Sequence, residues 1–164
     1  MVYVDHYPES GVEIFKERAD GSAVLALYNN KETSIGPDGH EQIQADVLFL
    51  NQRVKNVEDV TKNFDVYWKK LAAQARADLI TNYTVAVQNM MDRTAQTRGY
   101  DSIFTLCSYS NSTNTKFAAE ATAAVKWRDA VWEKCYEIED VVDAGTIPAP
   151  SLEELLKMMP SINW

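Results

Sequence analysis

The stretch from Thr113 to Gly145 constrains the fold more than any other part of the chain. Its apolar residues recur at alternating steps of four and three positions, which places them in one stripe along a helix. The stripe consists of Phe117, Ala121, Ala124, Val131, Cys135, Ile138 and Val142, and Trp127, Trp132 and Tyr136 flank it. This pattern predicts one long helix that carries the core of the fold.

Both ends of this helix are marked in the sequence. Asn111 to Asn114 are residues that cap helices or form turns. Gly145 supplies the left-handed residue that commonly follows the last helical turn. We expect the structural core of the helix to consist of Phe117, Trp127, Arg128, Val131, Trp132, Cys135 and Ile138.

Arg128 occupies a slot in the apolar stripe, where an unpaired charge is costly. We expect its stem to pack against Trp127 or Trp132 and its guanidinium to bond a carboxylate or a carbonyl, with Asp101 as the preferred acid. The substitution Arg128→Ala is then expected to lower the free energy of unfolding by roughly 2–4 kcal/mol. Binding of an anionic ligand is the alternative role.

The first 56 residues carry a β pattern. Val2 to Val4 is β-prone, and two β-leaning runs flank Asp20-Gly21, a strong hairpin signal. Asn29-Asn30 is predicted to be a turn, and so is the segment 36–39, which precedes the apolar run 47–50.

Short strands bury little surface by themselves, so this segment needs to pack on the helices, on another copy or on a partner. We therefore expect an interface in this region. Its candidate residues are Val12, Ile14, Phe15, Leu25, Leu27, Tyr28, Leu48 and Leu50.

A helical pattern without Pro or Gly runs from Val54 to Arg98. It predicts a helix of roughly 40 residues, or about 60 Å, and a break near Thr81–Thr84 is the alternative. Two short helices follow from local signals, one from Ile103 to Tyr109 and one opened by a capping box at Ser151.

The predicted fold is therefore α+β and mainly α. A small β-rich attachment segment, residues 1–56, precedes a helical domain, residues 57–164. We expect that domain to be a hairpin or bundle of two long and two short helices.

The charge and the hydropathy exclude two classes of partner. The chain has a formal net charge of -8 and no cluster of Lys or Arg, which argues against nucleic-acid binding. No window approaches the roughly 20 apolar residues of a membrane span. The first residues lack a basic region followed by an apolar run, so we expect synthesis in the cytoplasm without export.

We expect no catalytic residues, no metal and no cofactor. His6 and His40 lack metal-site spacing, and Cys107 and Cys135 do not form a CxxC motif. A hydrolase would need a nucleophile, a base and an orienting group within reach of one another, and no such set can be assembled from these residues. We interpret both cysteines as reduced structural thiols, although a disulfide between them is geometrically conceivable.

Acidic residues crowd the C-terminal end of the central helix, where the helix dipole prefers cations. They are Glu137, Glu139, Asp140 and Asp143. Two interpretations stay open, a solvated face and a contact for a basic partner surface.

An ordered series of short motifs runs along the second half of the chain. It comprises Arg98-Gly99-Tyr100-Asp101, Cys107-Ser108-Tyr109, Asn114, Phe117, Glu120-Ala121, Trp127 to Trp132, Cys135, Ala144-Gly145, Pro150, and Leu155-Leu156 before Pro160. With this series, the region from about Gln74 to Pro160 resembles a domain of unknown function found in tail-fibre, fibre-assembly and other small virion proteins of tailed bacteriophages. That family has no established catalytic residues, so the resemblance implies none here.

The resemblance implies a non-enzymatic virion protein, assembled in the cytoplasm of the host bacterium. Its expected partners are other tail or fibre proteins and further copies of itself. The alternative is a tail-fibre assembly chaperone that does not stay in the particle, and a small hydrolase is a third hypothesis. Residues 1–56 lie outside the resemblance, and we expect them to make the attachment.

Overall fold

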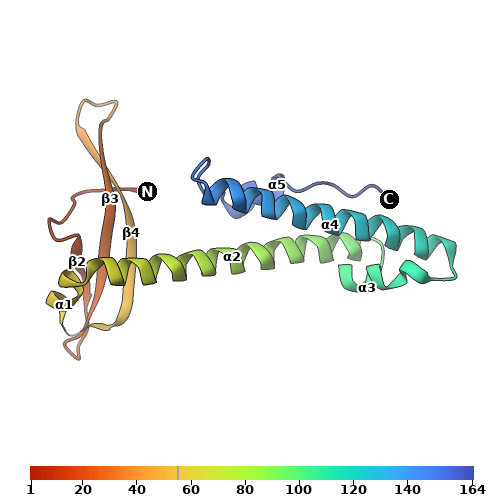
Figure 1. Cartoon of the computed structure of the whole chain (residues 1–164), viewed down its shortest axis with the longest axis horizontal. Coiled ribbons are helices and arrows are strands. Elements are labelled where there is room, and N and C mark those ends of the chain that lie inside the picture. Colours follow the sequence, from red (N-terminus) through yellow and green to blue (C-terminus); the bar gives the residue numbers. More distant parts are fainter. Residues whose placement is uncertain (55) are drawn as a thin grey trace. The chain divides into compact units, whose positions relative to one another are not determined.

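The computed structural model describes residues 1–54 and 56–164, and its fold is α+β and mainly helical, as predicted. Two compact units follow each other along the chain, Met1–Asp78 (unit 1) and Leu79–Trp164 (unit 2). Figure 1 shows the strands at the N-terminal end of the sequence and the helices after them.

The strands of unit 1 form an antiparallel sheet in the order β1-β4-β3-β2. Their bounds are β1 (Val2–Val4), β2 (Val12–Glu17), β3 (Ala23–Ile35) and β4 (Glu41–Val54). The helices that follow are α1 (Val57–Lys62), α2 (Phe64–Gln96), α3 (Ile103–Ser108), the 3-10 turn η1 (Tyr109–Asn111), α4 (Thr115–Asp143) and α5 (Leu152–Lys157).

The hairpin between β2 and β3 confirms the turn predicted at Asp20-Gly21. Gly21 takes a positive φ of 74° and donates its N–H to the Arg18 carbonyl at 3.0 Å. The Asp20 carboxylate accepts a hydrogen bond of 2.6 Å from the Ser22 hydroxyl, which closes the turn.

The turn predicted at Asn29-Asn30 is wrong, because β3 continues through it to Ile35. The chain absorbs the irregularity as a shift in strand register between Asn29 and Glu32, with Asn30 at a φ of 52°. The Asn30 side chain donates to Asp46 of β4 at 2.8 Å and so ties this irregularity to the neighbouring strand. The turn predicted at 36–39 is confirmed, and it closes the long β3–β4 hairpin.

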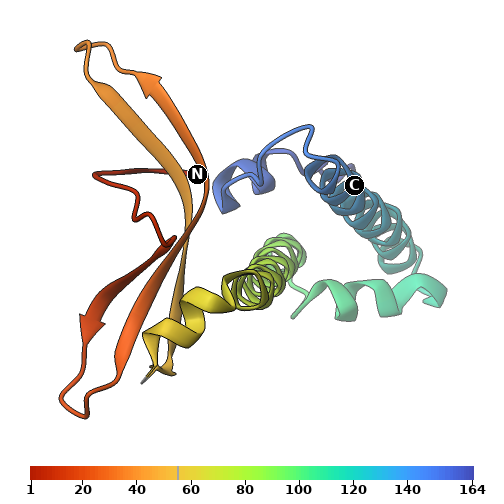
Figure 2. The same ribbon diagram turned by 60° about the vertical axis from the view of Figure 1, so that its left-hand side comes forward.

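The core of unit 1 lies between the sheet and the helices α1 and α2. It consists of Val12, Ala23, Leu25, Leu27, Leu50 and Val60, each with at most 7% of its surface exposed. Phe64, Trp68 and Leu71 of α2 pack against them, and Figure 2 shows α1 and the first turns of α2 beside the sheet. The expectation that Val12, Leu25, Leu27 and Leu50 form an interface is therefore corrected, since the chain's own helices already cover them.

Helix α2 runs without interruption through Thr81–Thr84, so the alternative of a break there is wrong. The helical run is interrupted earlier, at Asn63, whose backbone N–H and side-chain amide both bond to the Asp59 carbonyl. Secondary structure changes from strand to helix between Val54 and Val57, whereas the two compact units divide at Asp78, inside α2.

The helix ends of unit 2 follow the local signals. Ser102 caps α3 by accepting from the Thr105 N–H at 3.1 Å, and Asn114 caps α4. Gly145 has a φ of 68° and donates to Val142, while Thr146 donates to Val141, so a Schellman motif ends α4. The predicted capping box at Ser151 is also confirmed.

The core of unit 2 gathers residues from α2, α3, α4 and α5. Its most completely buried members, each with at most 2% exposed, are Val87, Met91, Ala95, Leu106, Ala124, Val131 and Leu155. Trp127 and Ile138 are also buried, as predicted, and Trp132 and Cys135 pack against this core while partly exposed.

Two residues expected in this core are not buried there. Phe117 is 36% exposed, because it lies in the first turn of α4, where its ring meets the Tyr109 ring edge to face at 5.6 Å between centroids. The side chain of Arg128 is 37% exposed, and its Nε and Nη2 donate to Asp129 Oδ1 at 3.0 and 2.8 Å. The predicted pairing with Asp101 is therefore wrong. Asp129, the next residue in α4, supplies the carboxylate instead, at the edge of the helix face that is buried.

Candidate protein-interaction surfaces

An exposed aromatic pair lies on the sheet of unit 1. The rings of Phe15 and Phe49 meet edge to face at 4.8 Å between centroids, and 64% and 44% of their surfaces are exposed. Phe15 lies in β2 and Phe49 lies in β4. Because β3 lies between these two strands in the sheet, the two rings meet across β3. Ala26 of β3, the register partner of Phe49, is only 1% exposed and leaves room for this contact.

A β-bulge explains why Phe15 projects from the strand. The pairing of β2 with β3 shifts register between Ile14 and Lys16, so Phe15 has no partner in the ladder. Bulges bend a strand locally and redirect a side chain. Ile14, next to it, is 45% exposed, so the edge strand presents two neighbouring apolar side chains.

A polar cluster fixes the chain beside this pair. The Glu13 carboxylate accepts from the Tyr28 hydroxyl at 2.8 Å and lies 3.2 Å from Nε2 of His6. Tyr7 donates its hydroxyl to the Tyr28 carbonyl at 3.1 Å. Burial, reinforced by the hydrogen bond to Glu13 and by its charge, raises the pKa of Tyr28 to about 12. The cluster holds the segment before β2 against β3.

Two shallow recesses lie on the helix side of the same sheet, both within unit 1. One, of about 330 Å³, is lined by Leu48, Trp68 and Ala72 among others. The other, of about 490 Å³, is lined by Leu48, Leu50, Leu71 and Ala75 among others. They arise because α2 presents alanines to the sheet beyond its aromatic residues.

The structure places the eight expected interface residues in three classes. Ile14 and Phe15 are exposed, Tyr28 and Leu48 are partly buried, and the other four belong to the core.

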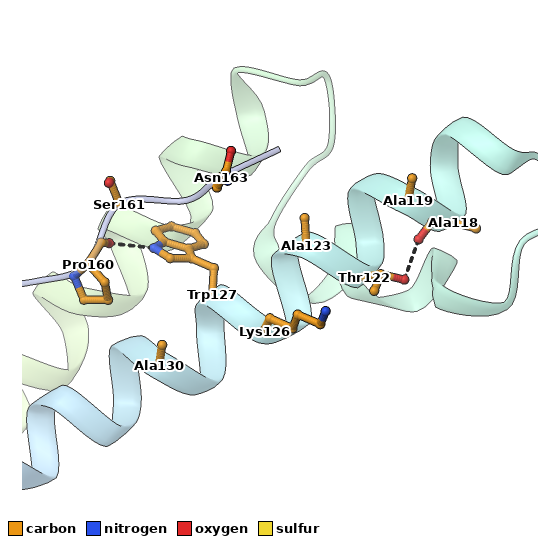
Figure 3. A pocket seen from close by; sticks show the side chains of 10 residues that line it. All are labelled: Ala118, Ala119, Thr122, Ala123, Lys126, Trp127, Ala130, Pro160, Ser161 and Asn163. Atoms are coloured by element: carbon orange, nitrogen blue, oxygen red, sulfur yellow. Dashed lines mark hydrogen bonds between the residues drawn. The ribbon is translucent and has the colours of Figure 1, made fainter.

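Unit 2 carries an open groove of about 720 Å³ along α4 (Figure 3). It is lined by Ala118, Ala119, Thr122, Ala123, Lys126, Trp127 and Ala130 of α4 and by Pro160, Ser161 and Asn163 after α5. The Trp127 indole donates to the Pro160 carbonyl at 2.7 Å and anchors the C-terminal segment as one wall. Sequence reasoning missed the groove because its alanines lie off the apolar stripe, although Ala119, Ala123, Lys126 and Ala130 follow helical steps of four and three.

A second polar cluster ties the chain together near the start of α4. Glu120 accepts from the Tyr100 hydroxyl at 2.7 Å and lies 3.5 Å from the guanidinium of Arg98. That guanidinium lies over the ring of Trp164, 4.5 Å from its centroid. Burial, with the hydrogen bond and the charge of Glu120, raises the pKa of Tyr100 to about 12. The sequence held no signal for this long-range set.

Both cysteines are free, which confirms the prediction that no disulfide joins them. Cys107 is buried, and the thiol of Cys135 lies 3.7 Å from the sulfur of Met159. Burial raises the pKa of both thiols, so their environment favours the protonated, less nucleophilic form.

Within residues 1–54 and 56–164, no three His, Cys, Asp or Glu side chains are grouped so that they would hold a metal ion. In the same part of the chain, no helix combines the length and the apolar composition that crossing a membrane requires.

Comparison of the chain with protein-family models, with curated proteins and with solved structures gives no match in any of the three.

Proposed function

We propose that the chain is a non-enzymatic structural protein of a tailed-bacteriophage particle, located in the tail or the tail fibre and attached through the sheet of unit 1. The exposed pair Phe15 and Phe49 is the observation that carries the attachment site. The resemblance of residues 74–160 to small virion proteins supports the setting.

Two exposed rings in contact with each other suit the centre of a protein interface. Aromatic residues are enriched among the few residues that supply most of the binding energy, and rings have little side-chain freedom to lose. The edge-to-face contact at 4.8 Å already holds both rings in one arrangement. Charged and polar neighbours such as Glu13 and Lys16 provide the wet rim typical of such a surface.

The test is incorporation into particles. A phage whose genome encodes the chain is produced with the double substitution Phe15→Ser and Phe49→Ser, and purified particles are analysed by quantitative mass spectrometry and electron microscopy. We expect the purified variant to keep its helical circular dichroism and its melting temperature, because both rings are exposed, but to be lost from particles.

The matched control is Phe104→Ser in unit 2, a phenylalanine that is 80% exposed. It removes a ring that is more exposed than either Phe15 or Phe49 and that belongs to unit 2, and it is expected to leave incorporation unchanged. Incorporation of the double variant at the normal copy number would overturn the attachment site.

The unaltered chain separates the proposed function from its alternative. A stoichiometric presence in purified particles supports the structural role. If the chain binds fibre protein during assembly but is absent from finished particles, the structural role is wrong and the chain is a fibre-assembly chaperone.

A further inference from the structure

We infer that the groove on α4 is a dimer interface, in which α4 of a second copy of this chain lies antiparallel to the first. The inference goes beyond the proposed function and does not depend on it, since it concerns how the chain associates with itself.

The charges of α4 are divided along its length. In residues 115–128, Lys116, Lys126 and Arg128 outnumber the single acid Glu120. In residues 129–143, Lys134 is the single cation against six acids, which are Asp129, Glu133, Glu137, Glu139, Asp140 and Asp143. One half of the helix is therefore positive and the other strongly negative.

This division opposes the helix dipole at both ends. A helix favours acids in its first turn and cations in its last turn, and α4 has neither. A second copy running antiparallel places the acidic half of each helix beside the cationic half of the other and compensates both ends at once. A parallel copy would set like charges side by side, so the charge pattern selects the antiparallel arrangement.

The groove provides the surface on which the two helices meet. Ala119, Ala123 and Ala130 share a face with Lys126, because they are spaced by helical steps. This face is distinct from the face of Ala124 and Val131, which is buried in the core of unit 2. Alanine side chains allow two helix backbones to approach closely, and Trp127 with the Pro160 segment forms a wall that limits sideways movement.

The charged residues on this face determine how far the two α4 helices overlap along their lengths. If the two helices cross with their centre between Asp129 and Ala130, Lys126 of each copy lies beside Glu133 of the other, because both residues are equally far from that centre. The pair is formed twice in a two-fold dimer, which is closed and self-complementary. Within one chain the two residues lie seven positions apart, about 10 Å along the axis, too far to pair directly.

The experiment is a charge exchange measured by sedimentation equilibrium on the full chain at low salt. We expect the wild type to dimerise, and Lys126→Glu and Glu133→Lys each to raise the dissociation constant about tenfold or more, since like charges then face each other. The double variant Lys126→Glu with Glu133→Lys restores the attraction in the opposite sense. It is expected to return to within about threefold of the wild type.

Lys157→Glu on α5 is the control, because this lysine pairs with Glu153 at 2.6 Å and does not line the groove. It changes the net charge as Lys126→Glu does and is expected to leave the dissociation constant unchanged. Lys126 is exposed, so circular dichroism should show each variant folded. A wild-type chain that stays monomeric, single variants that associate normally, or a double variant that is not rescued would each overturn the inference.

Discussion

Arg128 lies at the edge of the buried face of α4. Its neighbour Asp129 supplies the opposite charge, and so determines how much free energy the arginine charge costs at that position. The two side chains are 37% and 54% exposed, so water screens their interaction. The hydrogen bonds to Asp129 raise the pKa of the guanidinium further, and Arg128 stays charged. The helical spacing places Arg128 in the apolar stripe, but the ion pair that it forms with Asp129 is exposed and not buried.

The first prediction follows from this exposure. Arg128→Ala is expected to lower the free energy of unfolding by at most about 1 kcal/mol, because exposed ion pairs contribute little. Leu106→Ala, at a side chain with no exposed surface, is expected to cost about 2–5 kcal/mol through the cavity it leaves. Denaturant unfolding followed by tryptophan fluorescence measures both. A larger loss for Arg128→Ala than for Leu106→Ala would contradict the exposed position of the arginine.

Phe15 shows a similar effect of local geometry on one residue. In a regular strand its neighbours Ile14 and Lys16 would oppose residues two positions apart in β3. Here they oppose the consecutive residues Leu25 and Val24, so the bulge leaves Phe15 without a partner in the ladder. The ring then reaches Phe49 across β3, and the contact forms part of the proposed attachment surface.

Among the elements, the segment before β2 depends on a close approach to α2. Gly11 has a φ of 68°, and its N–H bonds to the Pro8 carbonyl at 2.9 Å while its carbonyl accepts from the Tyr28 N–H at 2.8 Å. A Cβ at this position would lie 3.1 Å from Cε2 of Phe64 and 3.2 Å from the Tyr28 carbonyl oxygen. Because Gly11 has no Cβ, the segment before β2 can pack closely against Phe64 of α2 and Tyr28 of β3.

The second prediction compares two glycines in unit 1. Gly21→Ala is expected to cost about 1–2 kcal/mol, from the left-handed backbone alone, because nothing lies within 4 Å of its added Cβ. Gly11→Ala is expected to cost a further 1–3 kcal/mol or so, since Phe64 must also move. Denaturant unfolding measures both losses, and Trp68, which packs against the core of unit 1, contributes to the fluorescence change. Equal losses for the two variants would contradict the contact between Gly11 and Phe64.

At the scale of the whole molecule, each unit contains a tyrosine bound to a carboxylate. Tyr28 donates to Glu13 in unit 1, and Tyr100 donates to Glu120 in unit 2. The pKa of each is raised from the ordinary 10 to about 12, so both hydroxyls bind their protons more tightly in the folded state.

The third prediction is a loss of stability in alkali. Because the folded pKa of these tyrosines is raised, their stabilising contribution is complete below pH 10 and is lost as the pH rises to about 12. The free energy of unfolding, measured across this window, is expected to fall less steeply in the double variant Tyr28→Phe with Tyr100→Phe. Identical slopes in the variant and the wild type would show that these tyrosines do not titrate as described.

The chain's fold class, its helix caps and most of its turns could be predicted before the structure was known, because their causes are local. Asn114, Gly145 and Ser151 bond to backbone groups within a few residues, and Asp20-Gly21 closes its own turn. For the candidate site, Ile14 and Phe15 were predicted to be interface residues and are exposed. Phe49 was missed, because it lies in an apolar run that is otherwise partly or fully buried.

Features that depend on distant residues could not be predicted in this way. Whether Leu25 and Leu27 meet a partner or the chain's own helices depends on where α1 and α2 pack. The extension of β3 past Asn30 depends on Asp46, sixteen residues away, and the groove on α4 depends on Pro160, thirty-three residues from Trp127. Residue types and spacing specify which backbone groups are satisfied locally, but burial and charge pairing are settled only when separate segments pack and exclude water from one another.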